Sequence, residues 1–228
     1  MREDGTPIAR GICIIDDLIE FAPQHALQYK DQIAQVLATS LSDEYPEVRQ
    51  AAAYGFGAMA LNSAPEWKPI AAAALEPLAR MISLPEARST EESTIATENA
   101  ISAVAKIVRH CTTGMDTNSI VSAFMQWLPI YEDKEESVHV YDFFAELLEA
   151  NNPAVLGTEN ANLPRILDII TKAFHLSAFD ETEESARVKQ RLITILKSME
   201  ANQVLFEAVL KSSTLNDDER STLQHLLH

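Results

Sequence analysis

Apolar residues along this chain recur every three or four positions, which is the spacing of helices that bury one face. Residues 43–60, DEYPEVRQAAAYGFGAMA, show the pattern clearly, because Pro46 is followed by an apolar stripe through Val48, Phe56 and Met59. The alanines and glycines of this helix leave little bulk between backbones, so we expect it to nest between two neighbouring helices. An ordinary helical bundle would also accommodate such a helix.

The same plan returns along the chain at intervals of roughly 40 to 50 residues, the length of one HEAT-type unit of two helices. Further second helices with an apolar face are predicted at 94–109, 135–149 and 183–199. Each second helix follows a first apolar helix, and these first helices are predicted at 25–41, 67–83, 118–128 and 163–175. The helical period persists throughout, so the pattern predicts an all-α chain, an α-solenoid (superhelix) of HEAT-type helical hairpins.

A Gly/Ser-rich or Pro-rich linker is missing from the sequence, so we expect residues 1–228 to form a single continuous array. The predicted helix pairs span 25–62, 67–110, 117–150 and 162–200. Residues 1–24 are interpreted as a half repeat with its second helix at 8–21. Residues 201–228 are interpreted as a terminal cap with segments at 204–210 and 217–227. Because the chain starts in a half repeat, we expect Met1 to begin a fragment of a solenoid that extends upstream. Pro77 is expected to kink the helix at 67–83.

The charge of the chain indicates what kind of partner it binds. Acidic side chains number 34 against 18 basic ones, for a formal net charge of −16. Nucleic-acid binding depends on cationic neutralisation of phosphates, so direct contact with nucleic acid is not expected, and a basic partner is favoured. Cys13 and Cys111 lie far apart, which is typical of a reducing compartment. Apolar stretches stay shorter than the ~18 residues of a membrane span, so we expect a soluble intracellular protein without membrane insertion.

One set of acidic residues is arranged along a single face of the helix predicted at 135–149. These residues follow one another at steps of four, three, four and three, and they are Glu135, His139, Asp142, Glu146 and Glu149. Like charges at this spacing repel one another, and that helix interleaves no lysine among them. Two interpretations stay open: a solvated helix face, or a trough for the Lys and Arg side chains of a basic cargo.

Several segments resemble the C-terminal HEAT repeats of the importin-β (karyopherin-β) family, and within it the importin-5 (karyopherin β3) type. The segments that carry the resemblance are GICIIDDLIEFAP at 11–23, PEVRQAAAYGFGAMA at 46–60, TENAISAVAKIV at 97–108, WLPIYEDKEESV at 127–138 and PAVLGTENANLPRI at 153–166. Repeat geometry does not require loops such as YEDKEES and LGTENANLP, which makes the resemblance more specific than a generic HEAT match.

The generic HEAT signature is present in the first complete repeat. Asp43 and Arg49 match the acid and the arginine that form a ladder between neighbouring repeats in this fold. Later repeats depart from the signature, because Thr97 and His139 occupy or lie near the arginine position.

The resemblance implies a nuclear transport receptor that shuttles between cytoplasm and nucleus. Its members bind cargo on the inner surface, release it when Ran-GTP binds, and contact Phe-Gly nucleoporins in the nuclear pore. The family's main Ran-binding region lies in its N-terminal repeats, so we assign no Ran contact to a residue of this chain. An acidic inner surface fits basic cargo, such as nuclear localisation signals, histones or ribosomal proteins.

Catalytic chemistry has little support in the sequence. The six histidines are scattered, and neither a nucleophile elbow nor a phosphate-binding glycine loop occurs. We therefore expect a protein that is not an enzyme and that uses no metal or cofactor. The alternative function is a HEAT-repeat scaffold subunit that organises another protein complex, in which the acidic face would serve solubility.

Overall fold

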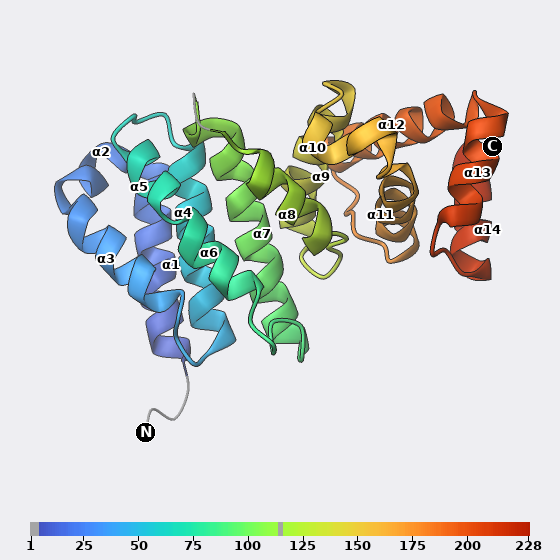
Figure 1. The fold of residues 1–228 in the computed structure, drawn as a ribbon. Coiled ribbons are helices and arrows are strands. Elements are labelled where there is room, and N and C mark those ends of the chain that lie inside the picture. Colours follow the sequence, from blue (N-terminus) through green and yellow to red (C-terminus); the bar gives the residue numbers. More distant parts are fainter. Residues whose placement is uncertain (1–4, 114–115) are drawn as a thin grey trace. The chain divides into compact units, whose positions relative to one another are not determined.

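The computed structural model of the chain describes residues 5–113 and 116–228, and residues 1–4 of the predicted half repeat lie outside this range. Within the described residues the regular elements are helices, with no strand, which confirms the all-α prediction (Figure 1). The chain divides into two compact units, Met1–Thr117 and Asn118–His228, and each is described by itself. Every helix in the described part is too short or too polar to cross a bilayer.

The first unit holds elements that Figure 1 colours from blue to green. They are α1 (Thr6–Phe21), α2 (Pro23–Ala26), η1 (Leu27–Tyr29), α3 (Lys30–Ser40), α4 (Pro46–Leu61), α5 (Trp67–Ala73), α6 (Leu75–Ile82) and α7 (Glu91–Cys111). The predicted second helices at 8–21, 46–60 and 94–109 correspond to α1, α4 and α7.

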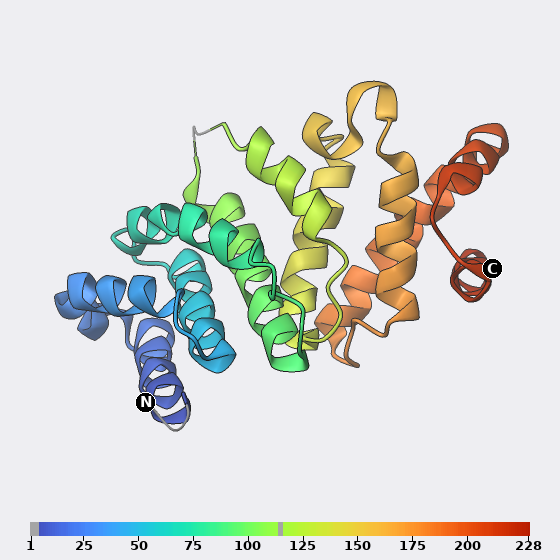
Figure 2. The same ribbon diagram turned by 60° about the horizontal axis from the view of Figure 1, so that its bottom comes forward.

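Helix α4 lies between α1 and α7 and packs against both, which confirms the predicted nesting (Figure 2). Two of its glycines lie against side chains of neighbouring helices. A Cβ atom at Gly55 would come within 2.8 Å of Leu37 Cδ1, and one at Gly57 within 3.2 Å of Lys106 Cδ. A side chain at 55 would therefore collide with its neighbours, whereas at 57 the flexible Lys106 side chain would have to shift only slightly.

The first helices of the two helix pairs in this unit are interrupted at more places than we predicted. The helix expected at 25–41 is split, because α2 is followed by the 3₁₀ turn η1 before α3 begins. The helix expected at 67–83 ends at Ala73 and resumes at Leu75. Pro77 explains this second break, since its ring clashes with the carbonyl of residue 73 and its nitrogen cannot donate.

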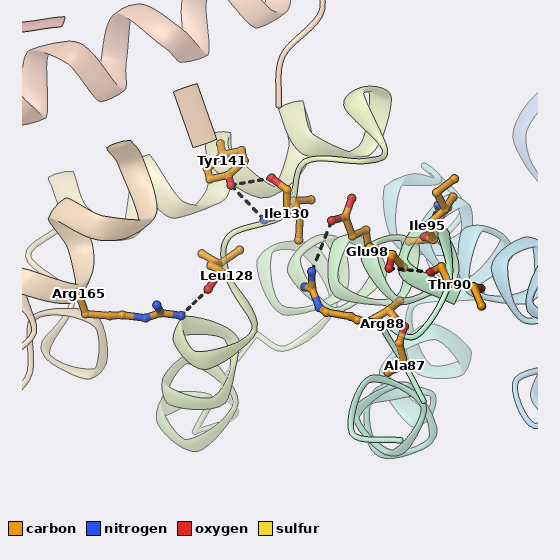
Figure 3. A network of polar contacts seen from close by, with 12 residues as sticks. Ala87, Arg88, Thr90, Ile95, Glu98, Leu128, Ile130, Tyr141 and Arg165 are labelled. Atoms are coloured by element: carbon orange, nitrogen blue, oxygen red, sulfur yellow. Dashed lines mark hydrogen bonds and ion pairs between the residues drawn. The ribbon is translucent and has the colours of Figure 1, made fainter. Parts of the chain in front are cut away.

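Helix α7 is buried along most of its length, and several polar residues on it or just before it are paired. Thr90 caps its N-terminus by accepting from the Ser93 N–H, at 3.1 Å. The fully buried carboxylate of Glu98 lies 3.6 Å from the Arg88 guanidinium, and both are shown in Figure 3. Thr97 donates its hydroxyl to the Ala87 carbonyl at 2.6 Å, so the position that replaces the repeat arginine ties α7 to the preceding turn.

The second unit holds the elements coloured from green to red in Figure 1. They are α8 (Asn118–Trp127), α9 (Lys134–Glu149), α10 (Pro153–Leu156), η2 (Thr158–Asn160), α11 (Leu163–His175), α12 (Glu183–Glu200), α13 (Gln203–Ser212) and α14 (Asp217–Leu227). The predicted bounds of α11 and α14 match these, whereas α10 and η2 were not predicted.

The turn between α8 and α9 is fixed by one side chain of α9 and one of α11. The Tyr141 hydroxyl accepts from the Ile130 N–H at 3.1 Å and donates to the Ile130 carbonyl at 2.8 Å. Arg165 of α11 donates to the Leu128 carbonyl, as Figure 3 shows, so its guanidinium neutralises the C-terminal end of α8. Phe124 and Phe143 pack edge to face between the two helices, with ring centroids 5.6 Å apart.

Helices α13 and α14 pack against both α11 and α12 at the end of the chain. The loop that joins them is held by the buried Asp168, whose carboxylate accepts from Thr214 N–H at 3.1 Å and from its hydroxyl at 2.7 Å. Asn216 and Glu219 form a capping box at the start of α14.

Candidate protein-binding surface on helix α9

Helix α9 is positioned by a cap and by a buried apolar face. The Asp133 side chain accepts from the Glu136 N–H at 3.0 Å, which fixes where the helix begins. Val140, Tyr141 and Phe144 are fully buried, so the opposite side of the helix faces outward.

The five residues of the predicted acidic stripe lie on that outward side. Glu135, Glu146 and Glu149 are exposed, while His139 and Asp142 are half-buried. The helical spacing therefore places the set correctly, with the carboxylates presented at the surface. We keep the name acidic stripe for Glu135, His139, Asp142, Glu146 and Glu149.

A cation from a later helix neutralises the C-terminal half of the stripe. Arg191 of α12 binds Glu149 in a bidentate manner, with Nη2 at 2.7 Å from Oε2 and Nε at 3.0 Å from Oε1. Its Nη1 also pairs with the Asp142 carboxylate. The spacing of charges along α9 could not point to Arg191, because this cation is supplied by the following second helix, α12.

This arrangement shifts the protonation equilibria of the pair. Hydrogen bonds from Arg191 lower the pKa of Glu149, and the attraction between the charges acts in the same direction. Hydrogen bonding to Glu149 likewise raises the pKa of Arg191. Glu149 and Arg191 therefore both stay charged across the physiological range.

A hollow lies next to the Glu149 end of the stripe. Its volume is about 420 Å³, and Glu149 and Arg191 are among the residues that line it. The other lining residues are Leu148, Asn151, Leu156, Leu163, Ile166, Thr194, Ile195, Ser198, Met199 and Leu205. We call this hollow the α9–α13 pocket, after the elements that contribute its walls.

Of the predicted ladder residues, Asp43 lies in the turn between α3 and α4, and Arg49 lies near the start of α4. The buried Arg49 donates Nη1 to the carbonyls of Asp43, at 2.8 Å, and of Glu44, at 3.1 Å. The Asp43 carboxylate accepts from the Tyr45 N–H at 3.1 Å. These bonds hold the turn within one repeat, and a ladder that joins Asp43 and Arg49 to neighbouring repeats stays a prediction.

The described residues were also considered for a metal site. Among those residues no group of three or more His, Cys, Asp and Glu side chains is placed to hold a metal ion.

Comparison with known proteins gives a consistent class. The HEAT repeat family matches residues 33–63, which cover most of α3 and all of α4. The chain is 24% identical over 193 residues to importin subunit beta-3 of Saccharomyces cerevisiae, with 83% of this chain and 17% of the relative covered. It is 25% identical over 195 residues to a probable importin-5 homolog of Dictyostelium discoideum, covering 83% of this chain and 18% of that protein.

Solved structures of the karyopherin Kap121p share the fold. A mutant Kap121p structure matches with a TM-score of 0.76 and 21% identity, over 100% of this chain and 20% of that one. Kap121p bound to the SUMO protease Ulp1p matches with a TM-score of 0.72 and 21% identity, over 94% of this chain and 18% of that one.

The fold thus defines a HEAT-repeat α-solenoid, and these relatives confirm the resemblance to the importin-β family. The chain spans less than a fifth of the length of the curated relatives that it matches.

Proposed function

We propose that this chain is a protein-binding C-terminal arm of a nuclear transport receptor, which carries basic cargo proteins through the nuclear pore under Ran-GTP control. The relatives support the receptor class, since they are importins. Among the solved relatives, Kap121p is seen bound to Ulp1p and to Ste12p. The whole receptor would shuttle between cytoplasm and nucleus.

The observation that carries the cargo part of this proposal is the acidic stripe on the outward side of α9. Glu135 and Glu146 are exposed there, in a chain with a net charge of −16. Such a surface steers basic segments toward it and favours Lys and Arg over neutral side chains. The cargo class would be nuclear localisation signals, histones or ribosomal proteins.

Ran-GTP and Phe-Gly nucleoporins belong to the proposal through the resemblance. The family's main Ran-binding region lies in its N-terminal repeats, whereas this chain resembles the C-terminal ones. We therefore expect Ran-GTP to leave a basic peptide bound to the isolated chain. Nucleoporin contacts are assigned to no numbered residue.

The test is binding of a Lys/Arg-rich import peptide to the chain as salt is raised. Affinity should fall with ionic strength, because exposed charges are screened within about 10 Å at roughly 0.1 M salt. The double variant Glu135→Lys and Glu146→Lys should weaken binding, and the helical circular dichroism spectrum should stay unchanged. Glu181→Lys with Glu207→Lys is the matched control, since these exposed acids lie off the stripe and change the net charge equally.

A scaffold that organises another protein complex is the second candidate function. The contact of Arg191 with Asp142 and Glu149 favours it, because a cation from the same chain gives part of the stripe a structural use. Equal loss of peptide binding in both double variants would show that only net charge matters. No loss in either variant would reduce the stripe to a solvated face and leave the scaffold as the better interpretation.

A further inference from the structure

The α9–α13 pocket is an apolar hollow with a charged pair on its lining. Its volume of about 420 Å³ lies within the range of ligand pockets, roughly 300–1,000 Å³. The side chains that make it apolar come from five elements or their ends, and they are Leu148, Leu156, Leu163, Ile166, Ile195, Met199 and Leu205. Leu205 is 44% exposed, and Val204 beside it is 82% exposed, so apolar surface continues out of the pocket.

We propose that this pocket seats one aliphatic or aromatic side chain of a basic peptide segment, while a neighbouring Lys or Arg of that segment replaces Arg191 on Glu149. The inference rests on the proposed function and deepens it, because it adds an apolar requirement to a stripe that otherwise selects only charge. The occupant is thus a partner segment in which basic and apolar residues are adjacent.

The apolar part of the occupant follows from the pocket walls. Ile195 and Met199 are half-buried on α12, one turn apart, and Leu163 is half-buried on α11. Covering such side chains with another apolar group removes their surface from water, which favours binding. Met199 adds an adaptable wall, since an unbranched thioether can conform to side chains of different shape.

The basic part follows from the charges around the pocket. Glu149 lines it and has a side chain that is 49% exposed, and Glu146 is exposed one turn earlier on α9. The bidentate contact with Arg191 demonstrates that Glu149 can hold a guanidinium in this position. An acidic segment would be repelled by these carboxylates, and a neutral one would gain nothing from them.

Arg191 acts in this scheme as an internal occupant of the cation site. It binds both Asp142 and Glu149 from a side chain that is 30% exposed. An incoming Lys or Arg can therefore exchange with it at the surface, with one cation leaving as another arrives. Glu149 stays paired with one cation throughout the exchange, and the apolar side chain in the pocket supplies the added affinity.

The experiment compares three short fluorescent peptides on the full 228-residue chain by anisotropy. The first is Lys/Arg-rich with one central Leu, the second has that Leu replaced by Ser, and the third keeps Leu but has its Lys and Arg replaced by Gln. The first should bind about tenfold more tightly than either of the others, a difference of about 1.4 kcal/mol. Equal affinity of the first and second peptides, or of the first and third, would overturn the proposal.

Variants of the chain test whether the preference for the Leu peptide arises in the α9–α13 pocket. Ser198 is an exposed residue that lines the pocket, and Ser198→Trp should fill it and remove the preference for Leu. Ala186→Trp is the matched control, because residue 186 is exposed on the same helix and does not line the pocket. A Leu preference that survives Ser198→Trp, or one that Ala186→Trp abolishes equally, would contradict the assigned place.

Arg191→Gln tests the exchange itself. If Arg191 competes with the peptide, the variant should bind the basic Leu peptide several-fold more tightly, with an unchanged helical spectrum. Weaker binding would overturn the exchange. Failure of this inference also differs from failure of the proposed function: salt-sensitive binding that is indifferent to Leu rejects only the pocket, whereas no binding of any basic peptide rejects the cargo role.

Discussion

The Oδ1 atom of Asp16 on α1 lies directly against Gly55 of α4. A Cβ atom at residue 55 would collide with this oxygen and would also lie 2.8 Å from Leu37 Cδ1. Asp16 itself is buried, and its Oδ1 has no hydrogen-bond partner among the described residues. The absence of a side chain at residue 55 thus leaves room for the buried carboxyl group of Asp16.

Gly55→Ala should destabilise the first unit, although alanine is the better helix former. The added methyl group must displace Asp16 or Leu37, and overpacking of this kind costs about 1–3 kcal/mol in the free energy of unfolding. Urea denaturation followed by circular dichroism measures the change.

Gly11→Ala is the matched control for this prediction. A Cβ at Gly11 meets nothing within 4 Å, and the residue is exposed on α1. This substitution should stabilise the chain by about 0.5–1 kcal/mol through helix propensity. Parallel behaviour of the two variants would show that the Gly55 contact does not limit the packing.

The burial of Asp16 makes stability depend on pH in an unusual direction. Desolvation, with the nearby charges of Asp17 and Glu20, raises the pKa of Asp16 from 3.8 to about 8. Between these two pKa values the folded state binds a proton that the unfolded state has lost. The contribution of Asp16 to the free energy of unfolding is therefore most favourable below pH 4 and declines as pH rises toward 8. The slope can reach about 1.4 kcal/mol per pH unit.

Asp16→Asn should abolish that slope, because the amide cannot ionise. The free energy of unfolding is measured for the parent and the variant from pH 4 to pH 8. The difference between the two isolates the contribution of Asp16 from those of other titrating groups. Asp17→Asn should keep most of the slope, since Asp17 is exposed and contributes only through its charge. A flat difference curve for Asp16→Asn would mean that the carboxyl group is solvated in the folded protein.

Helical periodicity was sufficient to predict the long elements. Helices α11 and α14 begin and end at the predicted residues because their apolar stripes stop at polar or proline-containing turns. The short pair α10 and η2 escaped prediction, since it is too short to show a period and depends on positive φ at Gly157, Glu159 and Asn160. Periodicity carries no information about such local turns.

Only the part of the candidate site that lies on helix α9 could be predicted from the sequence. The spacing of Glu135 and Glu146 placed the acidic stripe on the correct face, because a helix fixes which residues share a side. Arg191 lies 42 residues after Glu149, and its contact depends on how α12 packs against α9. The α9–α13 pocket requires five elements to converge, which a one-dimensional pattern does not encode.

Arg165→Met should destabilise the second unit while keeping the aliphatic part of the side chain. The guanidinium donates to the carbonyl of Leu128, with longer contacts of 3.4 Å to those of Met125 and Gln126. Removing a donor from partly buried carbonyls costs about 1–3 kcal/mol. Arg187→Met, at an exposed position of α12, is the control and should change the free energy of unfolding by less than about 0.5 kcal/mol. Comparable losses in both variants would deny the capping role.

A double-mutant cycle on Arg191 and Glu149 should give a small, salt-sensitive coupling. The variants are Arg191→Gln, Glu149→Gln and the two combined, with unfolding free energies from urea denaturation. Because both side chains are partly exposed, at 30% and 49%, we expect a coupling of about 0.5–1 kcal/mol.

The pH dependence of this coupling follows from the lowered pKa of Glu149. A depressed carboxyl pKa gives stability that is present above the unfolded value of 4.5 and is lost as pH falls through the lower folded value. The coupling should therefore be constant from pH 6 to pH 8, decrease in acid, and weaken in high salt. The stabilisation from Glu149 and Arg191 increases with pH in the acidic range, whereas the contribution of Asp16 decreases as pH rises toward 8. The two contributions can therefore be separated in one pH series. A coupling that is unaffected by both salt and acid would indicate that Arg191 packs against α9 through its aliphatic stem, with its charge playing no part.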